Sequence, residues 1–305
     1  MMLNEVTNMT NKTKYKIAVL GGDGRQAQIA SRLAKMGHRV SCFSVDGKLI
    51  RISGCEICMG VDKAMSGADF AILPLPLSKD GIHLNSLSQK IELSEIVTLA
   101  KKNGTRLFGG VVPSEFRRVC RELDVDVTDY YASESLQIKN ALPSAEGSLM
   151  IAMEHTDITV SGMRALVCGY GRIGKILADI LRKLGAKVTV AARRDEVLCE
   201  IEMSGFESVK IDGGDALSKA AECDVIFNTV PYVIFTERVM KNIRSSPLYI
   251  EIASSPGGID SSSARDSGID IIYAPSLPGR YAPRSAGDYV LETISEILSE
   301  RGIDL

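Results

Sequence analysis

The sequence has almost no net charge and no long apolar run, and each absence removes a class of function. Its 36 lysines and arginines against 38 aspartates and glutamates leave a formal net charge of −2, so it offers no basic surface for nucleic acid. No stretch reaches the roughly eighteen apolar residues that a membrane span needs. Residues 1–14 are polar and lack the apolar core of a secretion signal, so we expect a cytoplasmic protein without membrane association.

The spacing of the cysteines predicts neither a set of disulfides nor a metal site. The chain has seven, an odd number, and its CxxC motif at Cys55 and Cys58 has no second pair or nearby histidine to complete a zinc site. We therefore expect no metal. The partner of such a chain is a small molecule or another protein.

The order of apolar segments indicates an α/β protein. A chain of 305 residues with 45% hydrophobic content exceeds one ordinary core, so we expect two domains. Strand-like runs alternate with helix-like segments in both halves, which predicts parallel sheets. Between the halves, residues 133–154 predict a long helix that is interrupted near Pro143. A stiff proline-rich loop over 275–284 should precede a last helix over 286–300.

One segment carries a complete dinucleotide-binding fingerprint. A strand-like run is followed by Gly169-Tyr170-Gly171-Arg172-Ile173-Gly174 and then by a helix-like segment. Gly169 permits a tight turn, Gly171 lets the backbone approach a pyrophosphate, and Gly174 lets the helix pack closely. The helix N-terminus offers N–H groups to phosphate. These six residues are the first cofactor-binding candidates.

Three further segments at predicted strand ends complete the expected cofactor site. Arg193-Arg194 stands where an NAD site places an acid for the ribose 2′-hydroxyl. Two guanidiniums suit the 2′-phosphate of NADP, so we expect NADP, with NAD as the alternative if the arginines only face solvent. The loops Thr229-Val230-Pro231 and Ala253-Ser254 follow predicted strands and should contact the cofactor as well.

The N-terminal half repeats the same strand, turn, helix and strand pattern without a gap. Asp23 and Gln26 stand where the fingerprint has its second and third glycines. A carboxylate repels a pyrophosphate, and Gln26 hinders close helix packing, so this half predicts a related fold without a dinucleotide. Arg25, at the start of the helix, is a candidate for holding a small anion, and a plain surface arginine is the alternative.

Several motifs together resemble one family. They are Gly21-Gly22-Asp23 with Arg25-Gln26, Asn140-Ala141-Leu142-Pro143-Ser144-Ala145-Glu146-Gly147, His155-Thr156, the fingerprint, Asn228-Thr229-Val230-Pro231, Pro256-Gly257-Gly258 and Leu277-Pro278-Gly279. This combination resembles the A-subunit family of dipicolinate synthase over nearly the whole chain. The resemblance implies two Rossmann-like domains with parallel sheets, a cleft between them, and a C-terminal helix returning to the first domain. We expect a substrate domain over 1–140 with helix 286–305, and an NAD(P)-binding domain over 141–285.

The resemblance also implies an activity and its setting. It indicates oxidation of a dihydrodipicolinate-type ring to pyridine-2,6-dicarboxylate, in the mother-cell cytoplasm of a spore-forming bacterium. The implied partner is the flavoprotein-like B subunit of dipicolinate synthase. We also expect a homo-oligomer.

A dicarboxylate substrate needs a cation at both ends. Arg25 and Arg284 are therefore the candidates for bidentate pairing, and Asn140 is a further substrate-binding candidate. The proline-rich loop can present Arg280 in place of Arg284. His155 with Glu134 behind it is the candidate general base, and helix capping is the alternative role for His155.

Two other functions compete with this interpretation. A D-2-hydroxy-acid dehydrogenase shares the two-domain plan, but it needs a histidine late in the cofactor domain, and no histidine follows His155. A nucleotide-sensing module without catalysis remains the second alternative, because a fold alone does not establish chemistry.

Overall fold

The structure is a computed structural model that describes residues 13–48, 51–87, 89–212, 214–260 and 268–305. The polar residues 1–12 lie outside this described part. The chain divides into two compact units. Unit 1 comprises Met1–Leu136 and Pro283–Leu305, and unit 2 comprises Gln137–Ala282.

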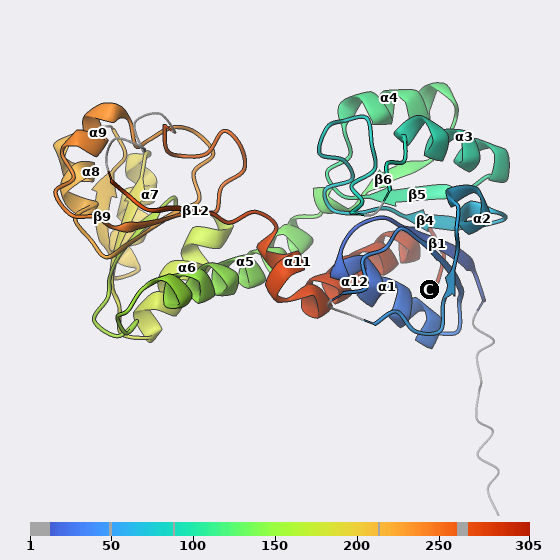
Figure 1. Cartoon of the computed structure of the whole chain (residues 1–305), viewed down its shortest axis with the longest axis horizontal. Coiled ribbons are helices and arrows are strands. Elements are labelled where there is room, and N and C mark those ends of the chain that lie inside the picture. The colour runs from blue at the N-terminus through green and yellow to red at the C-terminus, as the bar shows by residue number, and fades with distance from the viewer. Residues whose placement is uncertain (1–12, 49–50, 88, 213, 261–267) are drawn as a thin grey trace, which may run out of the picture. The chain divides into compact units, whose positions relative to one another are not determined.

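Unit 1 is built on a sheet of six parallel strands in the order β3-β2-β1-β4-β5-β6. Figure 1 labels four of them, β1, β4, β5 and β6. The strands are β1 (Lys16–Leu20), β2 (Arg39–Phe43), β3 (Glu56–Ile57), β4 (Phe70–Ile72), β5 (Arg106–Gly109) and β6 (Val127–Asp129). The helices are α1 (Gly24–Lys35), α2 (Val61–Met65), α3 (Leu93–Asn103), α4 (Ser114–Glu122), the short η1 (Tyr130–Ala132) and α12 (Pro283–Ser299). Apolar clusters cover both faces of this sheet, as its continuous apolar strands require.

The C-terminal helix α12 packs against α1 within unit 1. Val290, Leu291 and Ile294 share a buried cluster with Ile29 and Leu33. A Cβ built on Gly287 would lie 2.7 Å from the backbone oxygen of Arg25, so the two helices approach closely at this glycine. The expected return of the last helix to the first domain is confirmed.

Unit 2 repeats the architecture with the sheet order β12-β11-β10-β7-β8-β9. Its strands are β7 (Arg164–Cys168), β8 (Lys187–Ala192), β9 (Glu207–Lys210), β10 (Val225–Asn228), β11 (Leu248–Glu251) and β12 (Ile271–Tyr273). Its helices are α6 (Arg172–Lys183), α7 (Asp195–Met203), α8 (Asp215–Ala220), α9 (Glu237–Lys241), α11 (Leu277–Tyr281) and most of α5 (Glu134–His155).

Counted from the first strand of each unit, both sheets have the order 3-2-1-4-5-6, which is that of doubly wound dinucleotide-binding folds. The predicted α/β class with two Rossmann-like domains is therefore confirmed. In such sheets ligands bind at the carboxyl ends of the strands. The structure thus assigns one candidate binding edge to each unit.

Two local predictions were wrong. Helix α5 runs without interruption through Pro143, although that residue has no N–H for the carbonyl of Lys139. Buried contacts after the proline, made by Ala145 and Ile151, hold the helix in one piece. Residues 277–281 form the helix α11 instead of a loop. A proline is tolerated in the first turn of a helix, because the N–H group that it lacks would have no partner within the helix there.

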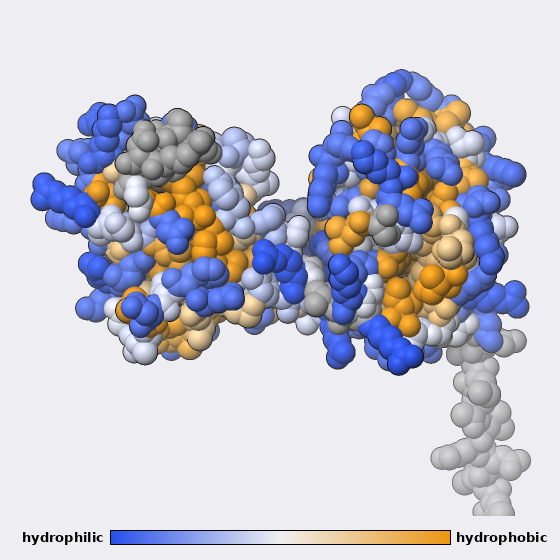
Figure 2. Space-filling model, in the orientation of Figure 1, coloured by the Kyte–Doolittle hydropathy of each residue, from blue (hydrophilic) through white to orange (hydrophobic). Residues whose placement is uncertain are grey.

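The surface of each unit is mixed in polarity. Figure 2 shows hydrophilic side chains over much of the visible face of both units, with apolar residues between them. Within the described residues, no helix combines the length and the apolar character needed to cross a bilayer.

The close contact between α12 and α1 can be tested at Gly287. We expect Gly287→Ala to lower the free energy of unfolding by about 1–3 kcal/mol, because the added methyl group has no room beside the backbone of Arg25. Urea denaturation measures the change. The exposed neighbour Ser285 supplies the control, since Ser285→Ala should stay within about 0.5 kcal/mol. Equal stability of both variants would contradict this packing.

Candidate functional site

The glycine loop after β7 is shaped by close backbone contacts. Gly169 adopts a φ of +95°, and its N–H donates to the carbonyl of Ala191 at 2.8 Å. A Cβ on Gly174 would lie only 2.0 Å from the carbonyl oxygen of Gly169. Helix α6 therefore begins directly against the turn, and any side chain at Gly174 would push the two apart.

The start of α6 leaves room for a phosphate. Gly171 is its N-cap residue, and no described side chain caps the helix there. A Cβ built on Gly171 meets no heavy atom of the described residues within 4 Å, so the space before the helix is open. The first turn contains no acid. A bare helix N-terminus with open space in front fits the pyrophosphate of a dinucleotide.

The other cofactor candidates lie at the same edge of unit 2. Arg193 and Arg194 follow β8, the neighbour of β7, and both are exposed. The Arg193 guanidinium lies 5.3 Å from the ring of Tyr232, which links this edge to the loop after β10. Arg194 pairs with Glu196 at 3.1 Å, an exposed contact that competes weakly with a stronger anion.

The two remaining loops follow the strands on the other side of β7. Thr229, Val230 and Pro231 come after β10, and Ala253 and Ser254 come after β11. The Thr229 hydroxyl donates to the carbonyl of Cys168 at 2.8 Å and thereby anchors its loop beside the glycine turn. The structure thus brings all the sequence-predicted cofactor residues to the carboxyl ends of four adjacent strands.

The corresponding turn of unit 1 is closed by its own side chains. Asp23 is the N-cap of α1, and its carboxylate accepts the Arg25 N–H at 3.0 Å. Gln26 is 1% exposed and points its Nε2 to the carbonyl of Leu73 at 3.4 Å. The N-terminus of α1 is therefore occupied by a negative group, and it offers no place for a pyrophosphate.

The prediction that Arg25 pairs bidentately with a substrate carboxylate is contradicted. Its Nε and Nη2 donate to the two carboxylate oxygens of Asp23, at 2.9 and 2.8 Å, and Nη2 also donates to the carbonyl of Leu75. Because both Nη2 hydrogens are used, neither edge of the guanidinium can make two bonds to another carboxylate. Arg25 is a buried structural cation, 5% exposed, that orients the turn.

Positive charge from two neighbouring side chains keeps the Asp23 carboxylate ionised. Burial by itself would raise the pKa of Asp23, but hydrogen bonds and positive charge from Arg25, with a further contribution from Lys79, hold that pKa below its ordinary value. Lys79 is exposed and lies in the loop after β4, at the same edge of the sheet. It is a cation that sequence reasoning missed.

Arg284, Asn140 and Arg280 are placed as follows. Arg284 is the second residue of α12 and is exposed, one turn before the glycine that contacts the start of α1. It therefore lies near the same edge of unit 1 as Arg25. Asn140 lies on α5 in unit 2, and its Oδ1 is buried without a partner among the described residues. Arg280, on α11, lies over the ring of Tyr281 at 5.1 Å.

The prediction that Glu134 supports His155 was wrong. The two residues are the first and last of the 22-residue helix α5, which separates them by roughly 30 Å at 1.5 Å per residue. His155 instead bonds to its own helix, with Nδ1 donating to the carbonyl of Ile151 at 3.0 Å.

His155 also lies at the wrong end of the sheet for chemistry at a nicotinamide. It lines a cavity of about 670 Å³ together with Arg164, Asp224 and Leu248, which stand at the amino ends of β7, β10 and β11. The glycine loop is at the opposite edge, roughly 15 Å along β7. His155 therefore cannot take a proton from a ring beside a dinucleotide bound at that loop.

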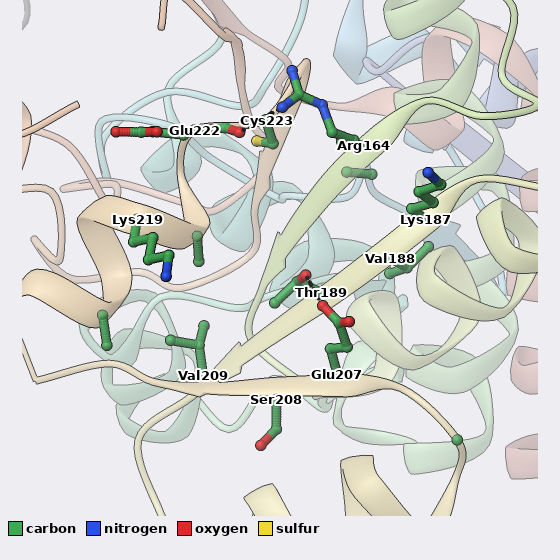
Figure 3. Close-up of a pocket in the computed structure, with 14 residues that line it drawn as sticks. Arg164, Lys187, Val188, Thr189, Glu207, Ser208, Val209, Lys219, Glu222 and Cys223 are labelled. Carbon is green, nitrogen blue, oxygen red and sulfur yellow. Dashed lines mark hydrogen bonds between the residues drawn. The ribbon is translucent and has the colours of Figure 1, made fainter. Parts of the chain in front are cut away.

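A second cavity of unit 2, of about 660 Å³, lies away from the glycine loop as well. Figure 3 shows its lining side chains, which come from the beginnings of β7, β8 and β9 and from α8. Arg164 and Lys187 are the first residues of their strands, and Thr189 donates to Glu207 at 3.2 Å across the floor. This cavity is distinct from the candidate dinucleotide site.

His83 and Glu251 were not predicted as site residues from the sequence. His83 lies in the loop after β4, and its Nδ1 is 2.7 Å from Asp80 Oδ2. Two residues on, Asn85 accepts the Gly22 N–H at 2.8 Å, so this loop lies beside the turn of unit 1. Glu251 is a buried acid at the end of β11. Only the fold brings these residues near a binding edge, and a single sequence carries no signal for either.

Comparison with known proteins agrees with the geometry of both units. Residues 16–131 match the N-terminal domain family of the dipicolinate synthase A subunit, and residues 142–274 match the NAD binding domain of S-adenosyl-L-homocysteine hydrolase. The dipicolinate synthase A subunit of Bacillus subtilis (strain 168) is 28% identical over 295 residues, covering 94% of this chain and 97% of the relative.

Solved structures give the same result. The dipicolinate synthase A subunit from Bacillus halodurans superposes with a TM-score of 0.80 at 28% identity, covering 94% of this chain and 99% of that one. Its counterpart from Bacillus subtilis gives 0.78 at 27% identity, with 94% and 97% covered. A transhydrogenase from Sinorhizobium meliloti, 13% identical with a TM-score of 0.66 over 93% and 94%, shares the fold. The resemblance to the dipicolinate synthase A subunit is confirmed, and with the NAD-binding domain it supports an NAD-dependent dehydrogenase-like role.

Two glycines of the loop allow fold and binding to be separated. We expect Gly174→Ala to lower Tm and to abolish dinucleotide binding, because its methyl group would collide with the Gly169 carbonyl. Gly171→Ala should leave Tm nearly unchanged, since the space there is open, yet weaken binding at least about tenfold by filling the place of the phosphate. Thermal unfolding and calorimetric titration measure the two effects. Undiminished affinity of Gly171→Ala would refute the site.

Proposed function

From its similarity to the dipicolinate synthase A subunit in both units, we propose that the chain oxidises a dihydrodipicolinate-type ring to pyridine-2,6-dicarboxylate. Unit 2 binds the nicotinamide cofactor and unit 1 binds the substrate. The observation that carries the proposal is the uncapped start of α6 behind the open space at Gly171, set against the self-capped start of α1. Electrons and protons balance: the dihydro ring and NADP⁺ give the aromatic ring, NADPH and one proton.

The cofactor is NADP in this proposal. Bound at unit 2, the nicotinamide would supply the two-electron acceptor for the ring. Arg193 and Arg194 would hold the 2′-phosphate, because no acid stands at the end of β8 and both guanidiniums are exposed there. The face of Arg193 already rests against Tyr232, which limits its loss of freedom on binding.

The two substrate carboxylates require cations at the carboxyl edge of unit 1. Since Arg25 is held by Asp23, we assign this role to Lys79 and Arg284, which are exposed near the turn of α1. Asn140 is a further hydrogen-bonding partner for the substrate. Orientation is the main requirement, because formation of an aromatic ring favours the reaction and leaves only one proton to remove.

We assign removal of that proton to His83. All three histidines lie within the described residues, and His83 is the one that follows the carboxyl end of a strand. Asp80 faces its Nδ1 at 2.7 Å, which fixes the ring and leaves Nε2 as the proton acceptor. A histidine oriented by a carboxylate is a common general base.

The setting of the reaction comes from the resemblance. We propose the flavoprotein-like B subunit of dipicolinate synthase as the partner, a homo-oligomeric assembly of this chain, and the mother-cell cytoplasm of a spore-forming bacterium as the location. A D-2-hydroxy-acid dehydrogenase is not favoured, because no histidine lies at the carboxyl edge of unit 2 among the described residues, and none follows His155 in the sequence.

Turnover distinguishes this enzyme from a nucleotide sensor. The full chain is assayed with NADP⁺ and dihydrodipicolinate, once alone and once with the flavoprotein-like partner. In at least one of these two mixtures it should produce reduced-nicotinamide absorbance and pyridine-2,6-dicarboxylate in equal amounts. His83→Gln should lower kcat roughly a hundredfold without changing cofactor affinity, whereas the matched variant His155→Gln should act like the wild type. Cofactor binding without any change in nicotinamide absorbance, both with and without the partner, would identify a sensor.

The cofactor preference has a separate test. Replacing Arg193 and Arg194 together by alanine should weaken NADP⁺ binding by roughly tenfold to hundredfold, the loss of a few charged hydrogen bonds to phosphate. Binding of NAD⁺, which lacks the 2′-phosphate, should not change. Titration of both cofactors decides the question, and equal losses for the two would remove the assignment.

A further inference from the structure

A buried acid joins the two loops that flank the glycine turn on the β10 and β11 side. Glu251, the last residue of β11, is 4% exposed. Burial of a carboxylate is costly unless hydrogen bonds replace its water. Its surroundings therefore need to supply several donors in fixed positions.

Four donors surround this carboxylate. Oε1 accepts from the side-chain amide of Asn228 at 2.7 Å and from the backbone N–H of Ala253 at 3.1 Å. Oε2 accepts from the backbone N–H of Gly258 at 2.8 Å and from the hydroxyl of Tyr249 at 3.2 Å. Two of the four bonds thus hold the beginning and the end of the loop 253–258.

Asn228 extends the same network to the loop after β10. It is fully buried, its Nδ2 also donates to the carbonyl of Val230 at 2.9 Å, and its Oδ1 accepts the Val230 N–H at 3.2 Å. The network is tightly packed, because a Cβ on Gly258 would lie 2.2 Å from Asn228 Nδ2. One carboxylate and one amide therefore join both loops in a single hydrogen-bonded network.

The position of these loops gives the network a role. In the sheet order β11-β10-β7-β8, the strands before these loops lie on one side of β7, and the strand before Arg193 and Arg194 lies on the other. A dinucleotide lying across this edge places its 2′-phosphate at the β8 side and its nicotinamide half at the β10 and β11 side.

We propose that Glu251 is the positioning residue for the nicotinamide half of the cofactor, acting through the loops 229–231 and 253–258. The proposal rests on the proposed function, since it requires a dinucleotide at this edge. Glu251 itself accepts hydrogen bonds from the loop 253–258 and, through Asn228, is connected to the loop 229–231. It thereby fixes the surface that would meet the nicotinamide ribose.

The test compares a whole cofactor with half of it. Glu251→Gln keeps the shape of the side chain but turns an NH₂ group toward donors, so the loops lose their anchor. We expect NADP⁺ binding to weaken roughly tenfold to hundredfold. Binding of adenosine 2′,5′-bisphosphate, which lacks the nicotinamide half, should change less than about twofold.

Two controls complete the comparison. Tyr249→Phe removes the single bond to Glu251 that reaches neither loop and should leave both affinities nearly unchanged. Glu251→Asp shortens the side chain. It should weaken NADP⁺ binding to a smaller degree and leave the binding of adenosine 2′,5′-bisphosphate unchanged, which keeps the test available if Glu251→Gln does not fold. Equal losses for both ligands, or undiminished NADP⁺ binding, would overturn the proposal.

Hydrogen exchange separates this proposal from the proposed function. In the wild type, the amide of Gly258 should exchange slowly, because Glu251 accepts its hydrogen bond, and Glu251→Gln should accelerate it at least about tenfold while the amides of β7 stay protected. If the wild type showed this protection but bound no dinucleotide, the network would stand as described and the proposed function would fail. Fast exchange in the wild type would refute the network itself.

Discussion

The close approach of α6 to the turn before it is the contact on which the binding edge of unit 2 depends. With no side chain at Gly174, the helix begins within van der Waals distance of the Gly169 carbonyl, and the backbone at Gly171 faces open space. The partial positive charge of a helix N-terminus is thereby left available to an anion. The arginines at the end of β8 and the loops after β10 and β11 lie at the same edge of the sheet as this turn.

Unit 1 shows what the same fold becomes when that space is filled. Asp23 caps α1 and forms an ion pair with Arg25. Gln26 is buried, and its side chain donates to the carbonyl of Leu73 just after β4. The helix N-terminus is satisfied internally, so the substrate contacts that we propose for unit 1 are exposed groups on a neighbouring loop and on α12. One sheet order thus occurs with an uncapped and with a self-capped helix start, and the difference follows from a few side chains at the first turn of each helix.

Local patterns predicted the fold, and they were enough to place the cofactor candidates at one edge of a sheet. The spacing of glycines, the strand before them and the helix after them are all short-range features, and the carboxyl ends of parallel strands gather their loops automatically. Helix α11 was missed because proline and glycine usually indicate a loop, whereas contact with α5 at Gly147 stabilises a helical turn there. Pro143 was expected to interrupt α5, and burial of the residues after it outweighs the lost hydrogen bond.

Side-chain roles were harder to predict, because they depend on contacts between distant segments. Arg25 stands at the start of a helix, where an anion is expected, but its guanidinium is already bound by Asp23 and the carbonyl of Leu75. His155 looked suitable as a rare histidine, yet the length of α5 places it at the amino edge of the sheet. The donors around Glu251 come from three separate stretches of the chain, and no spacing rule joins them.

A crystal structure of the full chain with NADP⁺ tests the central claim most directly. The account predicts the pyrophosphate at the N-terminus of α6, against Gly171, with the 2′-phosphate beside Arg193 and Arg194. Pyrophosphate density at the start of α1, beside Asp23, would contradict it.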